Sequence, residues 1–238
     1  MSMKILSLDS SATSASVCLY DTESDKIIGE FFINTKLTHS QTLVPMIDAL
    51  LSCTKNTLDD VDCFAVNVGP GSFTGIRIGV SVVKGMAMPL DKPCIDVSTL
   101  ESMAYNFIDR EDVVVCACMD ARRNQVYNAL FDIEDGTVKR LCDDRAIAID
   151  DLYTQLRNIS KPVVLVGDGA NLCYSNKPQD FDIELACERN RYQRASSLAL
   201  CAVEKIKNND VKNAQSLMPT YLRPSQAERE RINKEKEC

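Results

Sequence analysis

The sequence predicts an α/β fold with two lobes, each built on a mixed β-sheet that opens with antiparallel strands and closes with crossover helices. At 238 residues the chain can form one large domain or two small ones. A strand meander leads into alternating strands and helices, and the same order restarts near residues 108–112. The restart indicates a weak internal duplication. We therefore expect lobes at residues 1–110 and 111–225, followed by a charged tail at 226–238.

The strands and helices of each lobe are predicted from runs of aliphatic residues and from apolar residues that recur at helical spacing. Three runs bounded by Ser, Thr or Asp residues open the first lobe as a meander, and apolar residues recur at helical spacing from Leu43 onward. Residues 74–88 carry two apolar stripes, so this helix needs cover on two sides. We expect strands at 3–8, 15–20, 26–33, 63–68, 94–97, 113–119, 125–133, 137–142 and 163–166, and helices at 43–53, 74–88, 99–107, 150–158 and 194–207.

The composition is typical of a folded protein in a reducing compartment. Hydrophobic residues make up 45% of the chain and charged residues 26%. No apolar stretch reaches the roughly 18 residues of a membrane span, and the N-terminus enters a strand instead of a signal peptide. The 11 cysteines are scattered, and Cys116-Ala117-Cys118 lacks a second pair at zinc spacing. We expect buried thiols, no metal site, no membrane contact and a cytoplasmic location.

The charge balance bears on nucleic-acid binding. The chain has 27 basic and 34 acidic residues, a net charge of −7. A protein that binds a polyanion by itself usually shows a basic patch. If nucleic acid is involved, we expect another subunit to hold it.

Asp9 ends the first strand and opens a small polar hairpin, Leu8-Asp9-Ser10-Ser11-Ala12-Thr13-Ser14. A similar hairpin surrounds nucleotide phosphates in the actin, hexokinase and sugar-kinase superfamily, with its acidic residue near magnesium. No glycine is present here to let backbone donors approach a phosphate closely. The motif is either a nucleotide-binding hairpin, with Asp9 and Ser10 as candidates, or a Ser/Thr-rich turn with no ligand.

The longest motif is Gly69-Pro70-Gly71-Ser72-Phe73-Thr74-Gly75-Ile76-Arg77-Ile78-Gly79, which holds four of the nine glycines. Gly69 and Gly71 permit a tight turn from strand to helix, Ser72 or Thr74 can cap the helix, and the last two glycines let another backbone approach. Such a turn can hold an anion, which makes Gly69, Gly71 and Ser72 nucleotide-binding candidates. It is neither a Walker loop, since Gly-Lys-Ser/Thr is missing, nor a regular dinucleotide fingerprint, since the last glycine falls one residue late.

Two further motifs follow strands of the second lobe. The segment Asp120-Ala121-Arg122-Arg123-Asn124-Gln125-Val126-Tyr127 places two arginines at a turn, where either can pair with Asp120 or meet a phosphate, and we favour pairing. Gly167-Asp168-Gly169-Ala170 lies between a buried strand and a helix, where a nucleotide-binding relative would contact adenosine. We expect Asp168 to cap that helix.

These motifs, in this order, resemble the TsaB (YeaZ) family. The resemblance covers most of the chain, although residues 143–160 and 175–190 match no family position that we can name. It rests on Ile5-Leu6-Ser7-Leu8-Asp9-Ser10-Ser11, His39-Ser40-Gln41-x-Leu43, the glycine motif at 69–79, the segments 120–127 and 167–170, and Pro219-x-Tyr221-Leu222-Arg223.

The resemblance implies a two-lobed actin-like ATPase (ASKHA) fold with a degenerate nucleotide site. It implies that the chain is a scaffold or activator subunit of the complex that transfers threonylcarbamoyl to the adenosine beside the tRNA anticodon. Such a subunit has no catalytic residues and no enzymatic activity by itself. The implied partners are TsaD, as a heterodimer, and the ATPase TsaE, with a homodimer when the chain is alone and tRNA held only through the complex. No cofactor is implied for the chain itself, so ATP or ADP and Mg would bind only at the complex interface.

His39, the only histidine, is part of this resemblance. Catalytic relatives that transfer threonylcarbamoyl hold a metal with two histidines one helical turn apart, and Leu43 stands at the second position. That metal site cannot form here, so we expect His39 to cap a helix or to lie at an interface.

We expect the helices at 43–53 and 74–88 to form a docking face, because one apolar stripe of the second helix would cover the sheet and the other would need a partner. In the second lobe, Arg122 is a further candidate for nucleotide binding, in addition to those of the first lobe. The docking candidates are His39, Leu43, Ile47, Leu50, Gly75, Gly79, Val83 and Met86.

Two other interpretations remain open. An actin-fold phosphotransferase with its own ATP site would use Asp9 and the glycine turn, although no clear acid–base constellation accompanies them. A dinucleotide-binding domain would need the glycines after the first strand of its sheet and an acid about twenty residues later. Three strands precede the glycines, while Asp91 and Asp96 lie near the required distance.

Overall fold

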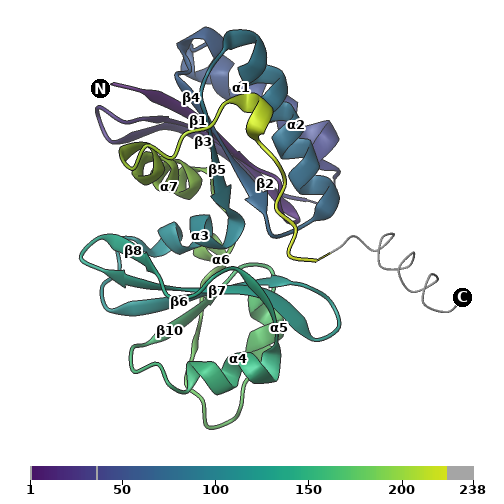
Figure 1. The fold of residues 1–238 in the computed structure, drawn as a ribbon, viewed down its shortest axis with the longest axis vertical. Coiled ribbons are helices and arrows are strands. Elements are labelled where there is room, and N and C mark those ends of the chain that lie inside the picture. Colours follow the sequence, from purple (N-terminus) through teal and green to yellow (C-terminus); the bar gives the residue numbers. More distant parts are fainter. Residues whose placement is uncertain (1, 36, 224–238) are drawn as a thin grey trace, which may run out of the picture.

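The computed structural model describes residues 2–35 and 37–223, which form two lobes, one above the other in Figure 1, each built around a β-sheet. The strands of the first sheet are β1 (Lys4–Asp9), β2 (Ser14–Asp21), β3 (Lys26–Asn34), β4 (Cys63–Gly69) and β5 (Cys94–Ser98). Those of the second are β6 (Val113–Asp120), β7 (Gln125–Glu134), β8 (Thr137–Arg140), β9 (Arg145–Ala148), β10 (Val163–Val166) and β11 (Glu184–Leu185).

Both sheets repeat one topology. The first has the order β3-β2-β1-β4-β5, and the second has the order β11-β10-β6-β7-β8 with β9 also paired to β7. In each, an antiparallel hairpin (β1–β2 or β6–β7) is joined along its first strand by a parallel strand (β4 or β10). The parallel strands are buried on both faces, as expected of strands covered by helices. The predicted duplication is therefore present in the fold.

Helices cover both faces of the first sheet. Helices α1 (His39–Thr54) and α2 (Phe73–Leu90) lie on one face, with Leu6 and Leu8 in their core. Helix α7 (Ala195–Lys207) lies on the other face, with Ile5 in its core. Neighbouring side chains of β1 enter opposite cores because successive residues of a strand point to opposite faces.

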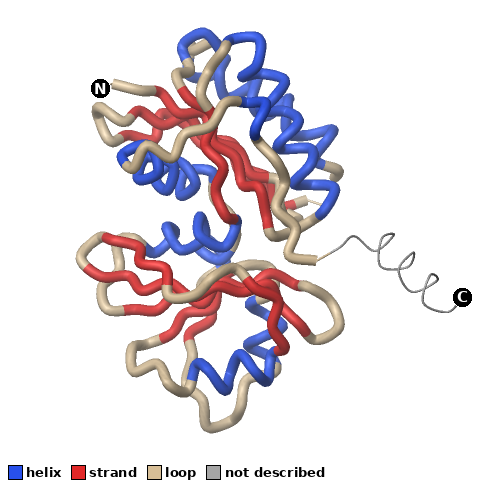
Figure 2. Tube along the Cα trace, viewed as in Figure 1, coloured by secondary structure: helices blue, strands red, loops and turns tan. Residues whose placement is uncertain are grey.

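The lobes meet at helix α3 (Thr99–Ala104), which lies between the two sheets (Figure 2). Leu100 and Met103 of α3 belong to the same apolar core as Val115 of β6 and Phe131 of β7. Helices α4 (Ile149–Leu156) and α5 (Ala170–Ser175) cover the outer face of the second sheet. The remaining helical pieces are α6 (Glu188–Arg191) and 3₁₀ turns at Leu58–Asp60, Tyr105–Phe107 and Ala214–Ser216.

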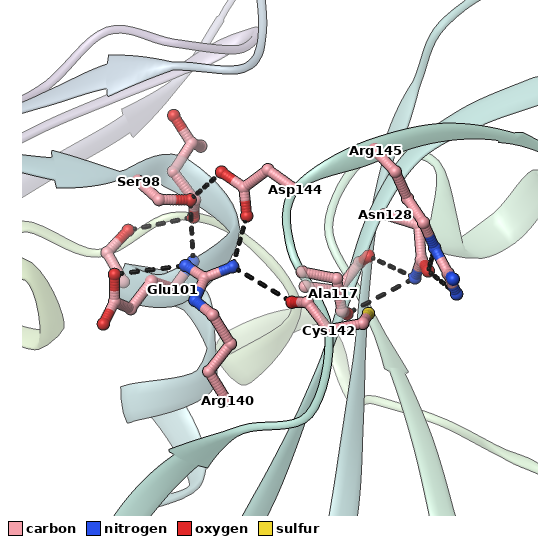
Figure 3. A network of polar contacts seen from close by, with 11 residues as sticks. Ser98, Glu101, Ala117, Asn128, Arg140, Cys142, Asp144 and Arg145 are labelled. Carbon is pink, nitrogen blue, oxygen red and sulfur yellow. Dashed lines mark hydrogen bonds and ion pairs between the residues drawn. The ribbon is translucent and has the colours of Figure 1, made fainter. Parts of the chain in front are cut away.

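A polar network adds to this apolar contact (Figure 3). The Arg140 guanidinium donates to Asp144 Oδ1 at 2.6 Å and to Glu101 Oε2 of α3 at 3.2 Å. Ser98, which caps α3, donates to Asp144 Oδ2 at 2.5 Å. The first-lobe helix is thus tied to the segment after β8 by charge-assisted hydrogen bonds.

Most predicted elements are present within a few residues of their expected bounds. The expected strand at 163–166 is matched by β10, while α1 begins four residues before the predicted Leu43. The short strands β9 and β11 and the helix α6 were not predicted. The domain boundaries remain a prediction, but α7, placed in the second segment at 111–225, packs against β1, β2 and β5 of the first lobe.

Two expectations, on the cysteines and on membrane spans, can be compared with the structure. Among the described cysteines most are buried, but Cys53 and Cys187 are exposed. No helix in the described ranges is both long and apolar enough to cross a membrane. The predicted charged tail at 226–238 lies outside the described residues.

Candidate functional site

The first hairpin turns its acidic residue inward. Asp9, the last residue of β1, has no solvent exposure and accepts hydrogen bonds from Ser11 Oγ at 2.7 Å and from Asn67 Nδ2 at 2.6 Å. Burial raises the pKa of the Asp9 carboxyl, although the donors from Asn67 and Ser11 lower it. Asn67 also donates to Ser102 Oγ of α3 at 2.9 Å. Asp9 is therefore part of a buried polar cluster where β1, β4 and α3 meet.

The glycine turn after β4 packs directly on this hairpin. Gly69 and Gly71 have φ angles of +123° and +154°, which glycine adopts most readily. A Cβ on Gly71 would lie 2.3 Å from Ser11 O, and one on Gly75 would lie 2.0 Å from Ser10 O. The predicted tight turn and close backbone approach are both present, and the approaching backbone is the chain's own hairpin.

The hydrogen bonds at the start of α2 are also internal. Ser72 caps the helix by accepting from Gly75 N at 3.2 Å, as the sequence predicts. The Ser72 amide donates to Ser11 O at 2.7 Å, and Ser10 Oγ donates to Gly75 O at 2.9 Å. The structure therefore brings five nucleotide-binding candidates together, namely Asp9, Ser10, Gly69, Gly71 and Ser72. Three of them, Ser10, Gly71 and Ser72, form the contact between the hairpin and the glycine turn.

This arrangement does not fit a nucleotide phosphate or its magnesium ion. A phosphate needs free amides and open space at a helix N-terminus, yet hairpin carbonyl oxygens occupy the space that Gly71 and Gly75 leave. A magnesium ligand needs an accessible carboxylate oxygen, whereas both oxygens of Asp9 already accept internal hydrogen bonds. Binding there would require the hairpin to move away from α2.

Arg122 lies outside this contact, at the tip of the β6–β7 turn. Its guanidinium is 3.8 Å from Asp120 Oδ2, and its side chain is 87% exposed. The favoured pairing with Asp120 is thus present, as a weak surface ion pair.

Asp168 does not cap α5, contrary to our expectation, because Gly169 precedes that helix and no side chain caps it. Asp168 Oδ1 instead accepts from Asp120 N at 3.3 Å. Burial, with a smaller contribution from the charge of Asp120, raises the pKa of Asp168 to about 6.

His39 is the first residue of α1, and Thr38 precedes the helix without a side-chain cap. The expected capping role is therefore not seen. The ring Nε2 lies 2.6 Å from Ala12 O, so His39 fixes the hairpin to α1, while Nδ1 is buried without a partner among the described residues. No group of metal-ligating side chains is present in the described chain, and Leu43 is fully buried.

The predicted docking residues lie mostly inside their own lobe. Both apolar stripes of α2 are covered there. In one stripe Gly75 and Gly79 face Ser10 and Val83 is fully buried, and in the other Ile76, Val80 and Ala87 are buried. Our premise that one stripe lacks cover within the lobe was wrong. Leu43, Ile47 and Leu50 of α1 are buried in the same core, and Met86 is half-buried.

A groove between α1 and α2 remains open. It encloses about 610 Å³ and is mainly apolar, and a Cβ added to Gly85 within it would meet no other atom within 4 Å. Val44 beside it is 55% exposed. We call this the α1–α2 groove; it is lined by Val44, Ile47, Asp48, Leu51, Ser52, Asn56, Thr57, Leu58, Val82, Gly85 and Met86.

The paired sheets, the inter-lobe helix and the hairpin–glycine turn define a two-lobed actin-like protein. The model of the family "TsaD: tRNA N6-adenosine threonylcarbamoyltransferase" matches residues 26–231. The TsaB protein of Bacillus subtilis is 31% identical over 98% of this chain and its own whole length, and that of Escherichia coli is 30% identical over 70% of this chain and 72% of its own. The chain belongs to the TsaB family.

Solved structures agree with this assignment. A Pseudomonas aeruginosa protein described as similar to peptidase YEAZ superposes with a TM-score of 0.81 at 25% identity, over 93% of this chain and 100% of that one. YeaZ from the same organism gives a TM-score of 0.77 at 25% identity, over 92% of this chain and 100% of that one.

Two groups of residues at the junction of the lobes could not be found from the sequence. Asn67 was visible only as one polar residue in an otherwise apolar strand. The Arg140 network gave no signal, because Glu101 lies 39 residues before Arg140 and no local pattern links the two.

Proposed function

We propose that this chain is a non-catalytic subunit that supports threonylcarbamoyl transfer to the adenosine beside the anticodon of tRNA, in the cytoplasm and together with TsaD and TsaE. Its curated relatives carry the name "tRNA threonylcarbamoyladenosine biosynthesis protein TsaB". The observation that carries the non-catalytic role is the closed contact between Ser10, Ser11 and the start of α2, which fills the place of the phosphates. ATP or ADP with Mg would then bind only where this chain meets a partner.

The α1–α2 groove is the proposed docking face for TsaD. The TsaD family model matches this chain from β3 onward, so a TsaD-type protein carries an equivalent pair of helices. Two related helix pairs can pack about a pseudo-two-fold axis, and two copies of this chain can do so about a true one. The same groove would therefore serve a TsaD heterodimer and a homodimer when the chain is alone.

Substitutions at the rim of the groove test this face without disturbing the core. Gly79 and Val83 are unsuitable, because changing either would destabilise the lobe itself. Val44→Asp and Gly85→Glu place a charge on the exposed surface, and we expect each to weaken association with TsaD by tenfold or more, about 1.4 kcal/mol. Association is measured by analytical ultracentrifugation, and tRNA modification is assayed with the same mixtures.

The matched control is Val211→Asp, since Val211 is 43% exposed, lies in the segment that follows α7 and is not among the residues that line the groove. It should leave association unchanged. Undiminished binding of the groove variants would disprove this face, and unchanged modification when the wild-type chain is omitted would disprove the proposed function.

The phosphotransferase alternative depends on an accessible nucleotide site in the isolated chain. Calorimetry with ATP and magnesium distinguishes it, because micromolar binding by the chain alone would favour a kinase-like enzyme over a subunit. The dinucleotide alternative has less support, since Asp96 pairs with Lys212 at 2.5 Å and Asp91 ends α2 in a left-handed conformation. A titration with NAD tests it.

A further inference from the structure

The last described segment, residues 217–223, crosses from the first lobe to the second, and we call it the strap. It is the yellow ribbon that descends beside α2 towards the lower lobe in Figure 1. Thr220 N donates to Val68 O at 2.7 Å, and the Tyr221 ring stacks on Phe73 with centroids 4.5 Å apart. Arg223 then reaches the second lobe, where its guanidinium donates to Ala121 O at 3.4 Å and to Gln125 Oε1.

Arginines gather around the strap. Arg77 Nε donates to the Tyr221 hydroxyl at 2.7 Å, with its guanidinium 3.8 Å above the Phe73 ring. Arg223 contacts the turn that contains Arg122 and Arg123, both of which are exposed. We call Arg77, Arg122, Arg123 and Arg223 the arginine cluster.

Most of the described arginines outside the cluster form ion pairs with carboxylates. Arg110 is paired with Glu184 at 2.9 Å, and Arg157 with Asp180 at 2.9 Å. Within residues 2–35 and 37–223 no carboxylate lies within 4.0 Å of Arg77, Arg123 or Arg223, and Arg122 has only the 3.8 Å contact with Asp120. On a chain of net charge −7, three of the four arginines of the cluster therefore have no carboxylate partner among the described residues, which makes this part of the surface locally positive.

The backbone under two of these arginines is held in an unusual conformation. Arg122, Arg123 and Asn124 have consecutive positive φ angles of 67°, 56° and 56°. Each such residue costs about 1 kcal/mol, and strained backbone of this kind often occurs at functional sites. The turn is fixed by Arg122 N donating to Asp120 Oδ1 at 2.7 Å and by Arg223, so the two side chains are displayed towards solvent.

Guanidinium groups suit phosphate oxygens, to which they can donate two parallel hydrogen bonds. The cluster extends from α2 across the strap to the β6–β7 turn, and Arg122 is almost fully exposed. An extended open surface fits a chain of phosphodiesters better than a single enclosed nucleotide. We propose that the arginine cluster contacts the phosphate backbone of the tRNA in the assembled complex; this inference rests on the proposed function and adds a direct RNA contact to it.

The test measures tRNA affinity of the complex reconstituted with a TsaD-type partner, over a series of salt concentrations. The variant is Arg122→Gln/Arg123→Gln, which removes two charges from an exposed turn and keeps its backbone. The matched control, Lys26→Gln/Arg189→Gln, removes two charges from exposed positions elsewhere in the fold. Circular dichroism melts check that both variants are folded.

We expect the cluster variant to bind tRNA about tenfold or more weakly at low salt, and its plot of log K against log salt to be shallower by about 0.7–0.9 for each phosphate that the variant no longer neutralises. The control should match the wild type. Equal losses of affinity in variant and control, or no loss in either, would overturn the inference. A loss of binding to the partner protein with tRNA affinity intact would also overturn it, because the cluster would then face protein.

The two proposals can fail separately. If the wild-type chain neither joins the partner nor raises tRNA modification, the proposed function fails and this inference fails with it. If the wild-type chain does both and the cluster variant binds tRNA like the control, only the RNA contact is wrong.

Discussion

The two hairpins that face each other across the lobes share a topology but differ in chemistry. Asp9 ends β1 and Asp120 ends β6, and a glycine turn after the neighbouring parallel strand crosses each hairpin. A Cβ on Gly71 would lie 2.3 Å from Ser11 O, and one on Gly167 would lie 2.1 Å from Cys118 O. Yet Asp9 is fully buried, while the side chain of Asp120 is 36% exposed.

The difference follows from what covers each hairpin. The first hairpin lies beneath α1 and the 18-residue helix α2, whose Gly75 and Gly79 leave room for Ser10. In the second lobe the equivalent helix α5 has six residues, and the strap contacts the hairpin through Arg223. Duplicated scaffolds can therefore carry a closed structural hairpin in one copy and an exposed charged turn in the other.

The largest expected effect is on the closed hairpin. Gly75→Ala would place its Cβ 2.0 Å from Ser10 O, which is backbone and cannot rotate away. We expect a loss of about 3 kcal/mol in the free energy of unfolding, measured by urea denaturation followed by circular dichroism.

Alanine substitutions at two other glycines serve as controls for this measurement. Gly169→Ala in the second lobe meets Met119 C at 2.9 Å and should cost less, while Gly85→Ala meets nothing within 4 Å and should stabilise α2 by up to about 1 kcal/mol. Similar costs at Gly75 and Gly85 would show that the hairpin does not pack on α2 as described.

The second effect concerns pH. Burial raises the folded-state pKa of Asp168 to about 6 from 3.8, so the folded state binds more protons than the unfolded state between these values. The free energy of unfolding should therefore fall as pH rises from about 4 to 6, by about 2–3 kcal/mol from this group, and change little above. Asp168→Asn should flatten the profile in this window and be more stable than the wild type at pH 7.

Asp9 extends this test to the other lobe. Its pKa is also raised by burial, so Asp9→Asn should likewise lose pH dependence above pH 3.8. Asp9→Ala is the contrasting variant, because it leaves the buried donors of Asn67 and Ser11 without an acceptor and should be destabilising at every pH. A pH profile as steep in both Asn variants as in the wild type would contradict the assignment.

The smallest effect is on the exposed turn. Arg123→Gly relieves a positive φ of 56° and should stabilise the fold by about 1 kcal/mol, measured by urea denaturation. Arg189→Gly, in the short helix α6, should destabilise by a similar amount because glycine disfavours helix. If Arg123→Gly were destabilising, the left-handed turn would not be the strained conformation described.

Much of the architecture could be predicted from local sequence. The run Val163–Val166 gave a buried strand because it is uniformly apolar, and Gly69 with Gly71 gave a tight turn because few other residues adopt their φ angles. The family motifs include both hairpins, and the motif at Pro219-x-Tyr221-Leu222-Arg223 lies in the strap, whose course between the lobes was not predicted. Residues 143–160 and 175–190, which matched nothing, are where β9, β11 and α6 went unpredicted.

The sequence by itself thus determined the type and order of most elements, the glycine turns and the family, because these depend on neighbouring residues and their spacing. Only the tertiary structure decided that both stripes of α2 are covered, that Asp9 is buried, that α7 returns to the first lobe and that Arg223 joins Arg122 and Arg123. The burial of a residue and its charge partners depend on segments that lie far apart in the chain, so a local sequence pattern cannot predict them.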